Sequence, residues 1–167
     1  MIPRPAAHPA LEFDVQYAVA PTGLPVRRTL RRWASAALER SARVTLRFVG
    51  GPESRRLNAA FRRKDYPTNV LTFVYDGSVD GRRRSRTTVP LAGDIVLCVP
   101  VLKREARAGN RPLRAHCAHL LVHGMLHLQG YDHEDEGDAA AMERREREIL
   151  ARLGYPDPYR GESATST

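Results

Sequence analysis

The stretch LRAHCAHLLVHGMLHLQGYDH, residues 113–133, carries the strongest structural and chemical signals in this sequence. Its apolar residues predict a long helix over residues 113–130. Gly130 is a natural end for that helix, because glycine readily adopts the left-handed conformation that follows many helices. The same freedom lets the chain turn back. We therefore expect residues 131–133 to lie beside the last turn of the helix.

Four histidines share one face of this helix. At 100° per residue, His116, His119, His123 and His127 fall within one narrow sector. They cannot all bind one ion, because His119 and His127 are roughly 12 Å apart along the axis at 1.5 Å per residue. His123 and His127 lie one turn apart and can share a metal. His116 and His119 either donate hydrogen bonds around that site or pack against the sheet.

A third histidine completes a known spacing. His123, His127 and His133 follow the pattern His-x-x-x-His-x-x-Gly-x-x-His, which is the ligand spacing of the metzincin zinc enzymes. Three protein nitrogens leave a fourth position open, as in catalytic zinc sites. We predict one metal ion bound by these three histidines. Imidazole ligands suit zinc, and also nickel, copper or iron.

The residue after the first histidine is Gly124, where zinc proteases carry a catalytic glutamate. Glycine has no group that can take a proton, so peptide hydrolysis by that route is disfavoured unless a base comes from elsewhere in the fold. Asp132 and Asp135 are candidates to orient a ligand imidazole, because metal-bound histidines commonly donate to an acceptor behind them. The sequence assigns no general base.

The charge of the chain points to a polyanionic partner. Net charge is +8, the pI is about 10.2, and nearly all of the positive charge is arginine, whose planar fork suits phosphate. Genomic base composition is an alternative source of an arginine bias. A compact domain this basic nevertheless attracts polyanions, of which nucleic acid is the commonest.

One basic group follows a predicted helix. Arg62, Arg63 and Lys64 lie at the C-terminal end of a short helix that has Pro52 in its first turn. They could neutralise a phosphodiester, where charge builds on the non-bridging oxygens in the transition state. They could equally form a solvated basic face that favours the helix C-terminus electrostatically.

Periodicity along the rest of the chain predicts a single α+β domain over residues 11–159. It holds a small mixed sheet of about four strands packed with about five helices, with the metal site at the C-terminal end of the long helix. Residues 1–10 and 160–167 are expected to be disordered. The expected strands are 11–19, 42–50, 69–75 and 91–100, and the expected helices are 27–41, 51–64, 101–109, 113–130 and 135–154.

The chain has no apolar run long enough to span a membrane, and its first ten residues lack the apolar core of a secretory signal. Cys98 and Cys117 lie in apolar stretches without a Cys-x-x-Cys pair, so we expect two buried thiols and no disulfide. These features favour a cytoplasmic protein.

The segments HGMLHLQGYDH, RRKDYPTNVLTF (62–73) and GDIVL (93–97) together resemble the YbeY family, bacterial endoribonucleases of ribosomal RNA maturation. The resemblance runs from about residue 11 to residue 159, through LGYPDPY. It implies one α+β domain with one metal ion, usually zinc, on His123, His127 and His133. It also implies a functional arginine after an aromatic residue in (Y/F)RxKD, which is Arg62 here.

The resemblance further implies cleavage of single-stranded RNA, maturation of the 3′ end of the small-subunit (16S) ribosomal RNA, and ribosome quality control. Expected partners are rRNA precursors, the small ribosomal subunit and ribosome-assembly proteins. This sequence departs from the family where Val74 replaces a frequent proline and where residues 76–90 form an arginine-rich loop. Its arginines are candidates for RNA contacts or for solvated charge: Arg82, Arg83, Arg84 and Arg86.

The resulting hypothesis assigns the metal to activation of water or an RNA hydroxyl, or to polarisation of the scissile phosphate. Arg62 would neutralise phosphate charge in the transition state. Two other interpretations compete with it. One is a metal-dependent hydrolase of peptides or small molecules, which Gly124 and the +8 charge disfavour. The other is a ribosome-assembly factor with a structural metal, which a fourth protein ligand would support.

Overall fold

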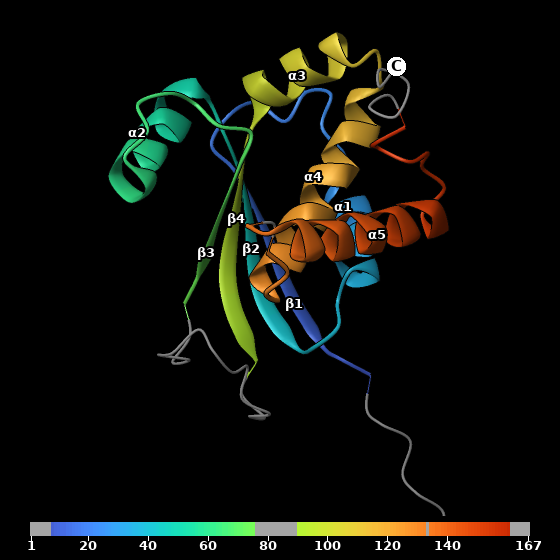
Figure 1. Ribbon diagram of the computed structural model, residues 1–167. Coiled ribbons are helices and arrows are strands. Elements are labelled where there is room, and N and C mark those ends of the chain that lie inside the picture. Colours follow the sequence, from blue (N-terminus) through green and yellow to red (C-terminus); the bar gives the residue numbers. More distant parts are fainter. Residues whose placement is uncertain (1–7, 76–89, 133, 161–167) are drawn as a thin grey trace, which may run out of the picture.

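Four strands and five helices form the part of the chain that the computed structural model describes, residues 8–75, 90–132 and 134–160 (Figure 1). Their order, βαβαββααα, is the order predicted from the periodicity of the sequence. The strands are β1 Leu11–Tyr17, β2 Ala42–Val49, β3 Val70–Val74 and β4 Leu91–Cys98. The helices are α1 Arg27–Ala36, α2 Gly51–Arg62, α3 Val99–Ala108, α4 Leu113–Leu128 and α5 Glu136–Arg152.

The strands form one mixed sheet in the order β1-β2-β4-β3. β1 pairs with β2, and β2 with β4, in parallel, whereas β3 runs antiparallel to β4. The expected α+β domain with a small mixed sheet is therefore confirmed. β3 lies at an edge of the sheet, so residues of its two faces can reach helices on either side.

The two faces of the sheet have different covers. Alternation along β2 places Val44, Leu46 and Phe48 in the main core, which α1, α4 and α5 complete. On the opposite face, Leu71 of β3 and neighbouring residues of β2 and β4 form a smaller apolar cluster with Leu57 of α2. Figure 1 shows α2 on the far side of β3 from α4. The edge strand β3 thus separates α2, which ends at Arg62, from α4, which carries the row of histidines.

Two glycines let α4 approach the sheet closely. A Cβ atom on Gly124 would lie 3.0 Å from Cγ2 of Ile95 in β4. A Cβ atom on Gly93 of β4 would lie 2.8 Å from Cδ2 of Leu128, in the last turn of α4, and 2.7 Å from the carbonyl oxygen of Phe73. Gly124 therefore faces the sheet, and a protease-type glutamate at this position would have to enter the packed core.

The end of α4 has the geometry expected from Gly130, whose φ is 98°. Its amide donates to the carbonyl of His127 at 2.9 Å, and the amide of Tyr131 donates to the carbonyl of Leu126 at 3.1 Å. This is a Schellman arrangement, which satisfies carbonyls of the last turn and turns the chain away from the helix axis. The predicted helix stop is confirmed.

The other predictions about the core are also confirmed. Cys98 and Cys117 are free and buried, and burial raises the pKa of the Cys117 thiol to about 12.

No helix among the described residues is long and apolar enough to cross a membrane. The arginines of residues 76–90 and the predicted disordered ends (the first ten residues and the last eight) fall wholly or largely outside the described residues.

Candidate functional site

The histidine face of α4 exists as predicted. Successive imidazoles of His116, His119, His123 and His127 are neighbours, with ring centroids 6.3, 6.4 and 6.5 Å apart. The helical repeat alone produces this row, since each step is three or four residues. His123 and His127 are the pair that lies nearest the C-terminal end of the helix, where the chain turns at Gly130.

His123 is oriented by a buried carboxylate. Its Nδ1 lies 2.5 Å from Oε1 of Glu146 in α5. A ligand imidazole binds a metal through one nitrogen while the other donates a hydrogen bond to an acceptor. With Nδ1 directed at Glu146, the nitrogen of His123 assigned to a metal is Nε2.

His127 is oriented in the same sense by a different group. Its Nδ1 lies 3.0 Å from the hydroxyl oxygen of Thr72 in β3. Thr72 pairs with Ile95 in the sheet, which places its side chain on the face that α4 covers. Both helical histidines therefore direct Nδ1 at a protein partner, one in α5 and one in β3, so a metal bound by this pair would be held through Nε2 of each.

His123 and His127 have the chemistry of metal ligands, because they are two imidazoles one helical turn apart. Each also has an oxygen near its Nδ1 that can accept a hydrogen bond. His133, the predicted third ligand, lies outside the described residues. Within the described ranges, no group of three His, Cys, Asp or Glu side chains could hold a metal ion. The three-histidine centre stays a prediction, of which the structure describes the two helical members.

The acceptor behind His123 differs from the candidates that the sequence suggested. Asp135 instead caps α5, where its Oδ1 accepts from the amide of Asp138 at 2.7 Å. Glu146 was not singled out by sequence reasoning, although a signal existed. It lies on the buried side of α5 with Met142, Ile149 and Leu150, so it is a charged residue within an apolar stripe.

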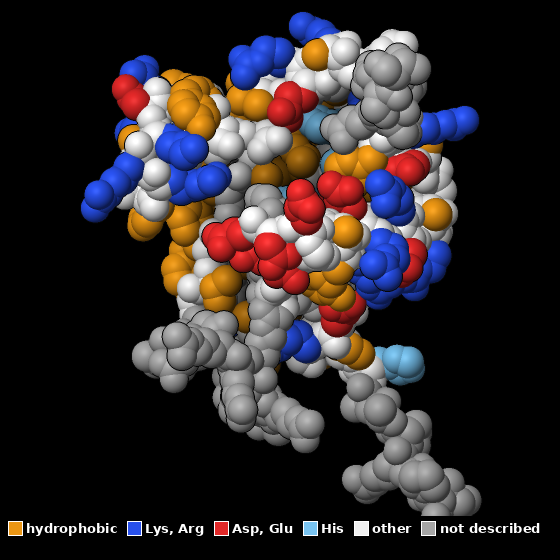
Figure 2. All heavy atoms as spheres, in the orientation of Figure 1, with side chains coloured by type: hydrophobic (Ala, Val, Ile, Leu, Met, Phe, Trp, Pro, Cys, Tyr) orange, Lys and Arg blue, Asp and Glu red, His pale blue; other side chains and the backbone are white. Residues whose placement is uncertain are grey.

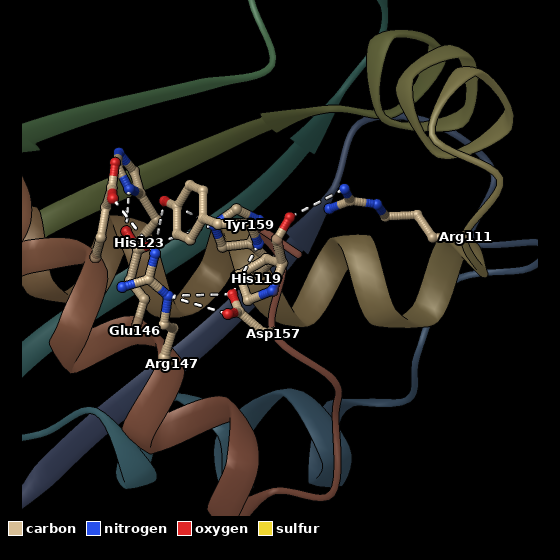
Figure 3. Close-up of polar contacts among 9 residues, drawn as sticks. Arg111, His119, His123, Glu146, Arg147, Asp157 and Tyr159 are labelled. Atoms are coloured by element: carbon tan, nitrogen blue, oxygen red, sulfur yellow. Dashed lines mark hydrogen bonds and ion pairs between the residues drawn. The ribbon is translucent and has the colours of Figure 1, made fainter. Parts of the chain in front are cut away.

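Glu146 gathers hydrogen bonds from three side chains (Figure 3). His119 Nε2 donates to its Oε2 at 3.0 Å, the hydroxyl of Tyr159 donates to the same oxygen, and His123 approaches Oε1. Burial of this fully buried carboxyl acts to raise its pKa, but the hydrogen bonds from His119 and His123 outweigh that effect and lower the pKa to about 2. Glu146 is therefore a carboxylate at neutral pH.

The remaining two histidines serve different partners. His119 is joined to His123 through Glu146, as one of the two expectations for it proposed. His116 Nε2 lies 2.9 Å from Oε1 of Glu105 in α3, and Glu105 also accepts from the side-chain amide of Asn69. Burial lowers the pKa of His116. His116 thus ties α4 to α3 and to the start of β3, away from the His123 pair.

Arg62 lies in the last turn of α2 and is exposed. The turn that follows is fixed by Arg63, which ends the helix in the left-handed conformation with φ 58°. The amide of Lys64 donates back to the carbonyl of Asn58 at 3.3 Å, and the buried Asn58 side chain donates to the carbonyl of Tyr66 at 2.8 Å. The basic turn is therefore held firmly while its charged side chains face solvent.

Exposed aromatic side chains accompany the basic turn. Phe61 is 66 % exposed, yet its ring packs edge-on against Phe73 of β3 with centroids 5.0 Å apart. Tyr66, two residues after Lys64, is also exposed. Figure 2 shows Lys and Arg side chains gathered over α2. Basic groups with exposed aromatic rings are the surface that binds single-stranded nucleic acid through phosphates and base stacking.

The edge strand β3 has the histidine pair of α4 on one face and α2, with its arginines and exposed aromatic rings, on the other. This arrangement fits a hydrolase of phosphodiesters. The family model described as endoribonuclease YbeY matches residues 24–154. The chain belongs to the YbeY family of endoribonucleases and is accordingly an enzyme that hydrolyses RNA.

Individual relatives agree with this assignment. The chain is 52 % identical over 157 residues to endoribonuclease YbeY of Burkholderia lata, covering 90 % of this chain and 87 % of that protein. It is 52 % identical over 166 residues to the protein of the same name from Nitrosospira multiformis, covering 95 % and 85 %. The solution structure of the Thermotoga maritima protein TM1509 has a TM-score of 0.52 at 20 % identity, covering 93 % and 96 %, which shows likeness of fold alone.

Proposed function

We propose that the chain cuts single-stranded RNA with one zinc ion held by His123, His127 and His133, and that Arg62 stabilises the transition state. The observation that carries the proposal is the orientation of two imidazoles one helical turn apart, His123 by Glu146 and His127 by Thr72. The two other histidines of this face, His116 and His119, contact their carboxylates through Nε2, whereas His123 and His127 contact their oxygens through Nδ1, as histidines that bind a metal through Nε2 do. This orientation supports a metal-binding role, because metal-bound histidines commonly donate their second ring nitrogen to an acceptor.

Each part of the site has a stated role. A bound divalent cation would supply Lewis-acid chemistry toward the scissile phosphate. Arg62 offers a planar, permanently charged donor fork to non-bridging phosphate oxygens, at which charge builds in the transition state. Phe61 and Tyr66 offer ring faces to unpaired bases, a contact that a base-paired duplex cannot make. These aromatic contacts favour single-stranded over double-stranded RNA.

In the cell, we place this activity in the cytoplasm, in maturation of the 3′ end of the small-subunit ribosomal RNA and in ribosome quality control. The small ribosomal subunit and its assembly proteins are the proposed partners. The support is membership in the YbeY family together with a net charge of +8, since ribosomal RNA is a large polyanion.

The test is cleavage of a labelled single-stranded RNA and of the matching duplex by purified, zinc-loaded protein. We expect cleavage of the single strand, with zinc bound one per chain by elemental analysis. His127→Ala should abolish cleavage and lower the bound zinc. Arg62→Ala should keep the zinc and slow cleavage about 10²- to 10³-fold, as loss of one donor to transition-state charge does elsewhere.

Arg152→Ala is the matched control for Arg62→Ala. Arg152 is likewise an exposed arginine in the last turn of a helix, α5. Figure 1 shows that α5 runs away from α2. The control should cleave at the wild-type rate. Unchanged cleavage by both His127→Ala and Arg62→Ala would contradict the mechanism, and cleavage of peptide but not of RNA would favour the competing hydrolase.

A further inference from the structure

Glu146 is a buried charge that the proposed mechanism does not yet use. It lies in the middle of α5, with a residue exposure of 0 %, among apolar side chains of the α4–α5 interface. A carboxylate is rarely placed there unless its charge is matched and its oxygens are hydrogen-bonded. Its ion-pair partners among the described residues are His119 and His123, and no arginine or lysine. Within those residues, no permanent positive charge pairs with it.

The three hydrogen bonds of Glu146 fix its side chain. Oε2 accepts from His119 and from the hydroxyl of Tyr159, which leaves Oε1 directed at His123 (Figure 3). Nδ1 of His119 is buried without a hydrogen-bond partner in the described part of the chain, so its proton belongs on Nε2, where Glu146 accepts it. Rotation of the carboxylate away from His123 would break both other bonds.

The donors come from distant parts of the sequence. Tyr159 belongs to the segment after α5, which is itself held in place: Nε of Arg147 lies 3.2 Å from Asp157, and Arg111 donates to the carbonyl of Pro158 at 3.1 Å. The guanidinium of Arg147 also lies over the Tyr159 ring, 5.2 Å from its centroid. The C-terminal segment thus holds Glu146 through Oε2, the oxygen that His123 does not approach.

We propose that Glu146 is a positioning residue of the metal centre, which holds His123 with Nε2 toward the ion and strengthens it as a ligand, while His119 and Tyr159 hold Glu146. This inference rests on the proposed role of His123 as a metal ligand. A carboxylate behind a ligand imidazole fixes its tautomer and raises its basicity. A metal dication held by His123 would supply positive charge near Glu146, which has no arginine or lysine partner among the described residues.

The competing explanation is that Glu146 only joins α4 to α5. The chain offers a control for it, because Glu105, although partly exposed, also contacts a histidine of α4, at 2.9 Å from His116 Nε2, and accepts from Asn69. His116 lies two helical turns from His123 and is not a predicted ligand. Removing either carboxylate removes a carboxylate–histidine contact between α4 and a neighbouring helix, but only Glu146 touches a predicted ligand.

The experiment compares zinc affinity, by competition with a chromophoric chelator, for the wild type, Glu146→Gln, Glu146→Ala, Tyr159→Phe, Glu105→Ala and His123→Ala. Each protein is first checked for folding by circular dichroism and by its melting temperature. We expect Glu146→Ala to weaken zinc binding about 10- to 100-fold. Glu146→Gln keeps an acceptor but loses the charge, so its loss of affinity should be smaller, and that of Tyr159→Phe smaller still.

Glu105→Ala should lower the melting temperature and leave zinc affinity unchanged. Cobalt(II) bound in place of zinc gives a second readout: its visible absorption bands should shift in Glu146→Gln and keep the wild-type pattern in Glu105→Ala. If Glu146→Ala does not fold, Glu146→Gln carries the comparison.

Wild-type zinc affinity and cobalt spectrum in folded Glu146→Gln would overturn the inference and leave the metal centre standing. A wild type that binds no zinc, or a His123→Ala variant that binds it as tightly, would instead overturn the proposed function and the inference with it. The two failures are therefore told apart by the wild type and His123→Ala.

Discussion

The two helical histidines face acceptors of unequal strength. His123 faces a carboxylate and His127 faces the hydroxyl of Thr72, a neutral acceptor that also has a proton to donate. A charged acceptor gives the stronger hydrogen bond. We therefore expect the two imidazoles to differ as ligands, with His123 the more firmly oriented and His127 the more easily displaced.

Substitution of Thr72 tests the weaker of the two hydrogen bonds. Thr72→Val keeps the shape of the side chain and removes the oxygen that lies 3.0 Å from Nδ1 of His127. We expect zinc affinity to fall about 10-fold, at the lower end of such effects, because the acceptor that is removed is neutral. Chelator competition measures it. Thr72→Ser restores the hydroxyl and should restore affinity, so equal weakening in both variants would speak against the hydrogen bond.

Three glycines offer a graded test of how closely α4 packs on the sheet. At Gly93, a Cβ atom would lie 2.7 Å from a backbone atom and 2.8 Å from a side-chain atom. At Gly124, it would lie 3.0 Å from the buried Ile95. At Gly137, it would meet only Oδ1 of Asp135, at 3.4 Å. Overpacking in a core costs about 1–3 kcal/mol, whereas alanine gains up to about 1 kcal/mol over glycine in an open helix.

The expected order of stability follows from those distances. Gly93→Ala should lose about 3 kcal/mol and Gly124→Ala about 1–2 kcal/mol, while Gly137→Ala should be neutral or slightly stabilised. Urea unfolding of the three variants measures the order. A stabilised Gly124→Ala would mean that Ile95 can move aside, and that this position is glycine for another reason.

The sequence predicted that His123 and His127 are neighbours, but it did not identify the residues behind them. His123 and His127 share a helix, so a helical wheel is enough to bring them together. Thr72 is 55 residues from His127, and Glu146 is 23 residues from His123 in another helix. Their hydrogen bonds depend on how β3 and α5 pack on α4, which periodicity does not specify. Of these two residues, only Glu146 gave a signal in the sequence, because it is a charged residue within the apolar stripe of α5.

Among the secondary-structure elements, α4 organises the domain, since α1, α3 and α5 all pack around it and β3 and β4 lie beneath it. Its C-terminal end is joined to the loop after α1 by the buried Gln129. The Oε1 of Gln129 accepts from the amides of Glu39 and Arg40 at 2.6 and 3.3 Å. Its Nε2 donates to the carbonyls of Ala37 and Met125 at 2.8 and 2.9 Å. The turn toward His133 therefore starts from a fixed point.

Removal of that amide should be costly. Gln129→Met keeps the length of the side chain but leaves buried backbone groups near Ala37 and Glu39 without their partner, so we expect a loss of about 2–4 kcal/mol. Chemical denaturation measures it. Tyr131→Phe is the control, because it removes only an exposed hydrogen bond to Glu39 nearby and should change stability by less than about 0.5 kcal/mol. Similar destabilisation of both variants would contradict the importance of the buried amide.

The elements themselves were predictable because each carries a local signal. Alternating apolar residues indicated β1 and β2, and Pro52 and Gly130 marked a helix start and a helix end that the structure confirms. β3 and β4 follow one another in the chain and pair antiparallel in the structure. The separation of α2 from α4 by the sheet was not predictable, because it depends on which face of β3 each helix covers.

On the face that Figure 2 shows, two groups of charged side chains lie near the site. Lys and Arg side chains gather over α2, and Asp and Glu side chains gather where α5 begins, a region that contains the exposed residues Glu134, Glu136 and Asp138. Phosphates are repelled from the acidic side and attracted to the basic side. An RNA strand should therefore lie over α2 and present one phosphate at a time toward the edge strand and the histidines beyond it.

Salt dependence of RNA binding tests that path. For single strands, the slope of log K against log salt concentration falls in magnitude by about 0.7 for each phosphate that the protein no longer neutralises. We expect Arg56→Ala and Arg62→Ala, both exposed on α2, each to reduce the slope by about that amount. Metal-free protein and fluorescence anisotropy with a labelled oligoribonucleotide allow binding to be measured without cleavage.

Arg152→Ala removes the same charge at the far end of α5 and should leave the slope unchanged, because Arg152 lies away from the proposed path and neutralises no phosphate there. Equal reductions in all three variants would show that RNA responds to the overall charge of +8 rather than to a path over α2.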